Sequence, residues 1–159
     1  MKKIIALLLA AAMILGLCAC GTKPKEFAVN EMEITLTDAF KERDLEGYDK
    51  SFDSSKAAVF VLREDKSQLG GLTLTLKEYA ELVRSSNVNR NPGEVKEEEG
   101  IFCFEYDNKN ADTGTVYHYY TAMFESGQAF WIVQFATRQD DWAKLRPEIL
   151  SYAKSVKFQ

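Results

Sequence analysis

The 159-residue chain contains three cysteines and one histidine, the side chains that most often bind metals or act as nucleophiles. Cys18 and Cys20 have the spacing of a C-x-C metal or redox pair, and Cys103 stands alone. The pair directly follows the apolar run from Ile4 to Leu17, and no histidine lies nearby. Two ligands are too few for an ordinary zinc site. The two sulfurs therefore need another explanation.

The first twenty residues resemble a bacterial lipoprotein signal. Lys2 and Lys3 precede the apolar run, which is too short to span a bilayer as an ordinary helix. The sequence LCAC, residues 17–20, matches the lipobox pattern of an aliphatic residue, a small residue, Gly or Ala, and the modified cysteine. The resemblance implies cleavage after Ala19 and a diacylglyceryl thioether on Cys20. The alternatives are an uncleaved transmembrane anchor, a secretory signal without lipid, and the C-x-C pair.

This interpretation divides the chain into a lipoprotein signal peptide (1–19), a tether (20–26) and one domain (27–159). A lipid anchor of two or three chains holds firmly, because each buried methylene contributes about 0.8 kcal/mol. We expect the protein on the cell membrane, facing the extracytoplasmic side. Loss of the two lysines of the signal takes the formal net charge from −4 to −6. Such an acidic body disfavours nucleic acid as a partner.

Hydrophobic patterns predict a largely antiparallel sheet with two helices. Strands are expected as a hairpin over 26–37 with its turn at Asn30, at 47–52, at 57–65, from Ile101, and as a hairpin over 115–137. Helices are expected from Leu76 to about Asn87 and from about 138 to the C-terminus. Strand 128–137 is apolar on both faces and needs cover on both. Either one helix lies on each face, or both helices share one face and the N-terminal hairpin covers the other.

Polar residues mark where the two helices begin and bend. Thr75 and Glu78 have the spacing of a capping box at the start of the first helix. Thr137 and Asp140 predict a similar cap for the second helix. Pro147 is expected to kink that helix or to restrict its first part to a separate turn.

The order of these elements resembles small bacterial lipoproteins of the PsbP-like fold, shared by the photosystem II extrinsic protein P and the Ran-binding Mog proteins. The resemblance rests on the helix LTLKEYAELV, the aromatic hairpin after it and the ending ILSYAKSVKF, and it extends from Phe27 to Phe158. It implies an α+β fold, an α/β/α sandwich around an antiparallel sheet. No photosystem or Ran contact motif matches, and a fold alone does not assign a function.

Two isolated side chains remain as candidates for chemistry. His118 lies in the aromatic strand YHYY, where one histidine is too little for a zinc site. It is either a surface or cleft histidine, or part of a ligand-binding cleft lined by Tyr117, His118 and Tyr119. Cys103 lies between two phenylalanines and is interpreted as a small buried hydrophobic side chain.

Two acidic segments are interpreted as solvated. An EF-hand beginning at Asp107 would need Asp or Asn where Lys109 stands, and one beginning at Asn108 would need Gly at Thr113 and Glu at Tyr119. The glutamates of EVKEEEG, residues 94–100, are expected to form a wet edge of the sheet rather than a catalytic carboxylate pair. Phosphate-loop, dinucleotide, nucleophile-elbow and zinc-protease motifs do not occur.

The sequence therefore predicts a non-enzymatic, lipid-anchored binding or accessory module that docks to an envelope protein. No cofactor and no metal is expected. The alternative is a carrier or sensor of a small apolar ligand, held in a cleft between helix and sheet near His118. An enzyme ranks last.

Overall fold

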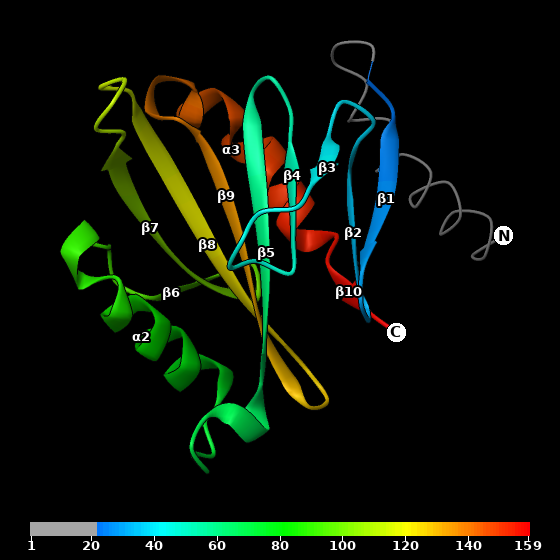
Figure 1. Cartoon of the computed structure of the whole chain (residues 1–159), viewed down its shortest axis with the longest axis vertical. Coiled ribbons are helices and arrows are strands. Elements are labelled where there is room, and N and C mark those ends of the chain that lie inside the picture. The colour runs from blue at the N-terminus through cyan, green and yellow to red at the C-terminus, as the bar shows by residue number, and fades with distance from the viewer. Residues whose placement is uncertain (1–21) are drawn as a thin grey trace, which may run out of the picture.

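The computed structural model describes residues 22–159, and the predicted signal with Cys18 and Cys20 lies outside the described residues. The strands are β1 (Pro24–Val29), β2 (Met32–Thr37), β3 (Lys41–Arg43), β4 (Lys50–Asp53), β5 (Ala57–Asp65), β6 (Lys96–Glu98), β7 (Ile101–Lys109), β8 (Val116–Ser126), β9 (Ala129–Arg138) and β10 (Lys157–Phe158). The helices are α2 (Leu76–Ser86) and α3 (Gln139–Lys154), with short 3₁₀ turns at Lys66–Gln68 and Val88–Arg90 (Figure 1).

The strands form two antiparallel sheets. The larger sheet has seven strands in the order β3-β4-β5-β9-β8-β7-β6, and the smaller has three in the order β1-β2-β10. Strand β9 is paired along its length on both sides, with β5 from Ala57↔Thr137 to Asp65↔Ala129 and with β8 from Tyr117↔Arg138 to Ser126↔Ala129. The mainly antiparallel α+β architecture is thus confirmed.

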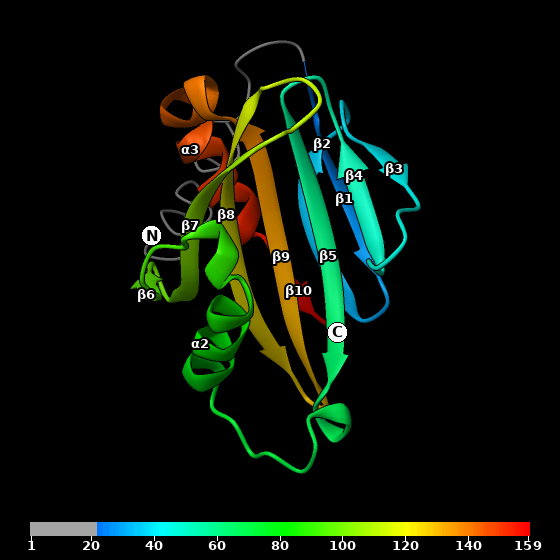
Figure 2. The same cartoon turned by 60° about the vertical axis from the view of Figure 1, so that its left-hand side comes forward.

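Alternation along β9 gives the large sheet two apolar faces. Trp131 and Val133 point to one face, which α3 and the three-stranded sheet cover; we call it the α3 face. Phe130 points to the other, where Tyr79 of α2 stacks on it with ring centroids 4.3 Å apart; we call it the α2 face. Figure 2 shows the two helices on opposite sides of the sheet. The first of the two predicted arrangements, one helix on each face, is the one that occurs.

Several local predictions are also confirmed. Asn30 adopts a left-handed conformation (φ 52°) in the β1–β2 turn. The capping box is complete, since the Thr75 side chain accepts from the Glu78 backbone and the Glu78 carboxylate accepts from the Thr75 backbone. Strand β5 has the predicted bounds. Strands β3 and β6 were not predicted as separate strands, because they are short, polar edge strands that show no apolar alternation.

Two predictions at the second helix and one boundary need correction. Thr137 does not cap α3: it is a buried residue of β9, and the N-cap is Arg138, whose side chain forms no capping hydrogen bond. Helix α3 continues through Pro147, so its first part is not a separate turn. Burial of Leu145 and Ile149 against the sheet holds the helix on both sides of the proline. Strand β1 begins at Pro24, within the stretch assigned to the tether, because Pro24 already pairs with β2.

Replacing the cap of α2 tests how much this helix depends on it. We expect Thr75→Ala to lower the free energy of unfolding by about 0.5–2 kcal/mol, because the backbone N–H of Glu78 loses the side-chain oxygen that accepts from it. Urea denaturation of the purified protein measures the loss. Thr73→Ala is the matched control, since Thr73 is also exposed but precedes the cap. Equal effects of the two substitutions would contradict the role of the capping box.

Candidate functional site

His118 is held between two carboxylates on the α3 face. Its Nδ1 lies 2.7 Å from Asp107 Oδ1 and its Nε2 lies 3.1 Å from Glu105 Oε2. Both acids come from β7, where Asp107 is the direct cross-strand partner of His118 and Glu105 is two residues further along the same face. The Trp142 ring of α3 stacks on the imidazole at 4.2 Å between centroids. The histidine side chain is only 12% exposed.

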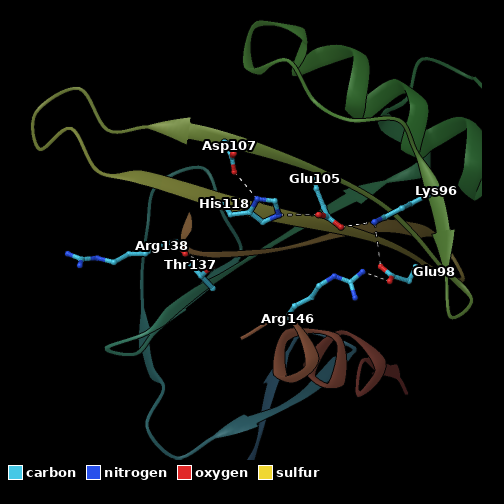
Figure 3. A network of polar contacts seen from close by, with 8 residues as sticks. All are labelled: Lys96, Glu98, Glu105, Asp107, His118, Thr137, Arg138 and Arg146. Carbon is cyan, nitrogen blue, oxygen red and sulfur yellow. Dashed lines mark hydrogen bonds and ion pairs between the residues drawn. The ribbon is translucent and has the colours of Figure 1, made fainter. Parts of the chain in front are cut away.

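The contacts of Glu105 extend this pair into a chain of charges, drawn in Figure 3. Lys96 Nζ lies 2.7 Å from Glu105 Oε1 and 3.8 Å from Glu98 Oε2. Arg146 of α3 donates to the other oxygen of Glu98. The chain joins β6, β7, β8 and α3 through their side chains. We call this set, with Asp107 and His118, the His118 network.

The protonation states of the network follow from these contacts. Burial alone would lower the pKa of His118, but its hydrogen bonds to Glu105 and Asp107 raise it. The bond from His118 and the nearby Lys96 lower the pKa of Glu105 to about 2, although burial opposes this. A histidine that donates from both nitrogens is an imidazolium. Neither ring nitrogen is therefore free to act as a general base.

The α2 face carries an open pocket beside the helix. Helix α2 covers the β7 and β8 side of this face and leaves the β5 side exposed, where a cavity of about 370 Å³ lies between helix and sheet. We call it the helix groove. Its lining is largely apolar and aromatic: Tyr48, Leu62, Leu69, Tyr79, Leu82, Val83 and Ile132. The polar lining includes Glu64, which accepts from the Tyr79 hydroxyl at 2.5 Å, and Arg90, which donates to the Tyr106 hydroxyl at 3.1 Å.

A second, larger cavity of about 510 Å³ opens where β5, β8 and β9 meet the start of α3. We call it the polar pocket. Its lining includes cationic, amide and tyrosine side chains that could bind a ligand: Lys56, Asn108, Asn110, Tyr117, Tyr119 and Arg138. The ring of Tyr119 stacks on Tyr106 at 4.8 Å with an angle of 5° between the planes. The Tyr106 hydroxyl in turn accepts from Gln134 at 3.0 Å, so Tyr119 is supported by the sheet beneath it.

Several solved structures are similar to this chain. Cyanobacterial PsbP (CyanoP) of Synechocystis sp. PCC 6803 matches with a TM-score of 0.56 and 14% identity, over 91% of this chain and 99% of its own. The Ran-binding protein Mog1p of Saccharomyces cerevisiae matches with a TM-score of 0.57 and 8% identity, over 87% of this chain and 96% of its own. The domain has the PsbP-like fold.

A protein of Bacteroides thetaiotaomicron matches with a TM-score of 0.57 and 14% identity, over 85% of this chain. It is about twice as long, since the match covers 48% of its own chain. No protein-family model and no curated protein matches. The resemblance to the PsbP-like fold that the sequence suggests is confirmed. At such low identity the similarity concerns the fold alone, so the sites must be judged on this chain's own side chains.

The PsbP-like sheet separates the three residues that the sequence grouped as a ligand site. Tyr117 and Tyr119 line the polar pocket on the α2 face, whereas His118 faces α3. Strand alternation imposes this separation, because successive side chains point to opposite faces. No single cleft of the described region contains all three. A ligand at the two tyrosines remains a prediction.

The structure confirms the interpretation of Cys103 and contradicts that of Glu98. Cys103 is fully buried in the core of the α3 face, and burial raises the pKa of its thiol, so the interpretation as a small hydrophobic side chain is confirmed. The wet-edge interpretation is wrong for Glu98, whose side chain is 21% exposed and pairs with Arg146. That partner lies 48 residues away in sequence, and no local pattern indicates it.

Among residues 22–159, no cluster of three or more His, Cys, Asp and Glu side chains is placed to hold a metal ion. Neither of the two described helices is long and apolar enough to cross a membrane.

The His118 network predicts a defined dependence of stability on pH. The folded-state pKa lies above the unfolded value of about 6.5. The contribution of His118 is therefore fully present below about pH 6.5 and is lost as the pH rises through the folded pKa. We expect His118→Gln to lower the free energy of unfolding by about 1.5–3 kcal/mol at pH 6, the range for hydrogen bonds to charged groups. Urea denaturation at several pH values measures it.

The difference between wild type and His118→Gln should narrow as the pH rises from 6 to about 9, because the wild-type imidazolium deprotonates in that direction. A difference that stays constant over this range would show that His118 contributes only through packing. Lys144→Gln serves as the control, because Lys144 is an exposed residue of α3 outside the network.

Proposed function

We propose that this PsbP-like protein is a non-enzymatic module, anchored to the extracytoplasmic face of the cell membrane by lipid on Cys20, which docks to an envelope protein. The observation that carries the docking proposal is the helix groove, an apolar cavity of about 370 Å³ left open beside α2. Leu82 and Tyr48 line it and remain 45% and 38% exposed. Exposed apolar surface around a groove is typical of protein interaction sites.

Helix α2 presents the groove as a rigid edge. Its buried face, with Tyr79 and Ala80, is fixed against Phe104, Met123 and Phe130 of the sheet. Its Leu82 side faces the groove and solvent. A partner segment that inserts apolar side chains there would bury Leu82 and the half-exposed Tyr48 ring without rearranging the core.

The nucleophile and base candidates of the chain support a binding role over an enzymatic one. Both ring nitrogens of His118 are engaged by carboxylates, and its ring lies against Trp142. The Cys103 thiol is buried, with a raised pKa that disfavours the reactive thiolate. Neither group lines the helix groove or the polar pocket.

A short tether would keep the domain near the membrane. Only residues 21–23 separate Cys20 from Pro24, where β1 begins. Lys23 is already fixed: its backbone N–H donates to the Asp38 side chain at 3.0 Å, and its carbonyl accepts from the Asp38 backbone at 2.8 Å. At about 3.5 Å per residue, the start of β1 would lie within roughly 14 Å of the backbone of the lipid-bearing Cys20.

The second candidate function is a carrier or sensor of a small apolar ligand. The groove volume of about 370 Å³ is that of a small ligand site, and Arg90 and Gln134 add polar groups to an otherwise apolar lining. A bound lipid or metabolite, rather than a protein, would then copurify.

The role of the helix groove in binding is tested by substituting two exposed leucines, one inside the groove and one outside it. The lipidated, C-terminally tagged full chain is purified in mild detergent, and its partners and bound small molecules are identified by mass spectrometry. We expect Leu82→Glu to reduce recovery of a stoichiometric envelope protein at least tenfold, because a charge enters the apolar groove. Leu72→Glu is the matched control, since Leu72 is 58% exposed but lies outside the groove.

Three outcomes decide between the candidates. Loss of one protein with Leu82→Glu alone supports docking through the groove. Loss of a bound small molecule instead supports the carrier. If both variants recover the same partner in equal amounts, the helix groove is not the docking site.

The anchor is tested by a pair of cysteine substitutions. We expect Cys20→Ala to abolish lipid labelling of the chain and to remove it from the detergent phase on phase partitioning, because the thioether has no sulfur to form on. Cys18→Ala should leave both unchanged, since the lipobox resemblance assigns Cys18 to the discarded signal. Membrane retention of Cys20→Ala would indicate an uncleaved anchor instead.

A further inference from the structure

We propose that the polar pocket binds an anionic sugar derivative, a hydroxylated ring that carries one carboxylate or phosphate group. This inference goes beyond the proposed docking function and uses a different surface, because the residues of the polar pocket do not line the helix groove. It rests on three features of the pocket: its cations, its neutral polar groups and its tyrosine rings.

The charge of the pocket is carried by Lys56 and Arg138. Both are exposed, and neither side chain forms an ion pair or hydrogen bond with another residue of 22–159. Figure 3 shows the Arg138 side chain directed away from the His118 network, although its neighbour Thr137 faces that side. By contrast, Lys96 and Arg146 on the α3 face are both paired with glutamates. Unpaired cations beside a cavity are free to bind an anion.

Asp141 also lines the pocket, so its lining combines two cations with one carboxylate. Asp141 pairs with neither Lys56 nor Arg138 among the described residues. The net local charge is then one positive unit, which matches a single acidic group on the ligand. A carboxylate such as Asp141 also accepts hydrogen bonds from ligand hydroxyls.

Neutral polar groups form the remaining rim. Asn108, Asn110 and Ser55 are exposed at the mouth of the pocket. The Asn110 side-chain oxygen accepts from the backbone of Asp112 at 3.0 Å and of Thr113 at 2.9 Å, which fixes the amide and leaves its N–H groups available. Amides and hydroxyls that both donate and accept suit the hydroxyls of a sugar ring.

The two tyrosines supply flat surfaces for such a ring. Tyr119 is held by its stacking on Tyr106, and Tyr117 lies two residues away on the same face of β8. Both are half-buried, so each presents an apolar body together with a polar hydroxyl. Because Tyr119 is already fixed, binding would cost little ordering of that side chain.

The same features disfavour other anions. A long polyanion such as nucleic acid would be repelled by a chain with a formal net charge of −4. An acidic peptide would bring several carboxylates to a pocket whose charged lining, Lys56, Arg138 and Asp141, has a net charge of only one positive unit. A small anion with a hydroxylated ring matches both the charge and the size of the pocket.

The experiment is a calorimetric titration of the lipidated full chain in mild detergent. The probes are glucuronic acid and glucose 6-phosphate, which carry the two candidate acidic groups, with glucose as the neutral counterpart and inorganic phosphate as the anion without a ring. An acidic tetrapeptide is the further competitor. We expect glucuronic acid or glucose 6-phosphate to bind about tenfold or more tightly than glucose, inorganic phosphate and the peptide. Comparison of these two probes shows whether the pocket prefers a carboxylate or a phosphate group.

Four variants locate the site. Lys56→Gln and Arg138→Gln should each weaken binding of that probe about tenfold, the loss of one charge-assisted hydrogen bond. Tyr117→Ala should weaken it by a similar factor, whereas the charge-matched control Lys144→Gln should leave it unchanged.

The outcomes are distinct. Equal binding of inorganic phosphate and the sugar acids would reduce the pocket to a simple anion site and overturn the proposal. Tighter binding of the peptide than of the sugar acids would indicate that the pocket binds a protein segment and would overturn the proposal. Failure of both glucuronic acid and glucose 6-phosphate to bind would also overturn it. None of these results depends on whether Leu82→Glu loses a partner.

Discussion

The two apolar faces of β8 and β9 determine how the rest of the protein is built. Trp131 and Val133 on one face and Phe130 on the other are excluded from water only if both faces are covered. The α3 face receives two covers, helix α3 and the three-stranded sheet β1-β2-β10, whereas the α2 face receives one eleven-residue helix. The single helix is too small for a seven-stranded sheet, so the helix groove stays open beside it. The polar pocket opens at the end of the sheet, where Tyr117 and Tyr119 of the α2 face meet the start of α3.

Most of the fold could be predicted because its signals are local. The alternation of strand β5, the glycine turn between β8 and β9 and the reciprocal Thr75–Glu78 cap are each contained in a few residues. Thr137 failed as a cap for the opposite reason. Its spacing to Asp140 is correct, but Thr137 pairs with both β5 and β8, and the pairing with β8 extends β9 one residue further to Arg138. Tertiary pairing overrode a local capping pattern at Thr137, and strand pairing likewise places Pro24 in β1 rather than in the predicted tether.

The candidate sites were less predictable, since they are assembled from distant elements. Arg146 reaches Glu98 across 48 residues, and Trp142 of α3 covers a histidine of β8. The grouping of Tyr117, His118 and Tyr119 was correct about an aromatic strand and wrong about a common cleft. The period of two along β8 contains the information that they face opposite ways. The position of a ligand cavity, on one face of the sheet or the other, depends on how much of each face its helix covers, and no local pattern in the sequence gives that.

The distribution of charge follows the same division between the faces. On the α3 face the half-buried groups must be paired, because an isolated charge there would be poorly solvated; Lys96, Glu105 and His118 satisfy one another. At the polar pocket solvent reaches Lys56 and Arg138, so these cations persist without partners among residues 22–159. A ligand that pairs with them gains charge-assisted bonds and breaks no existing ion pair. The open end of the sheet at this pocket therefore supplies both the space and the unpaired charge that binding requires.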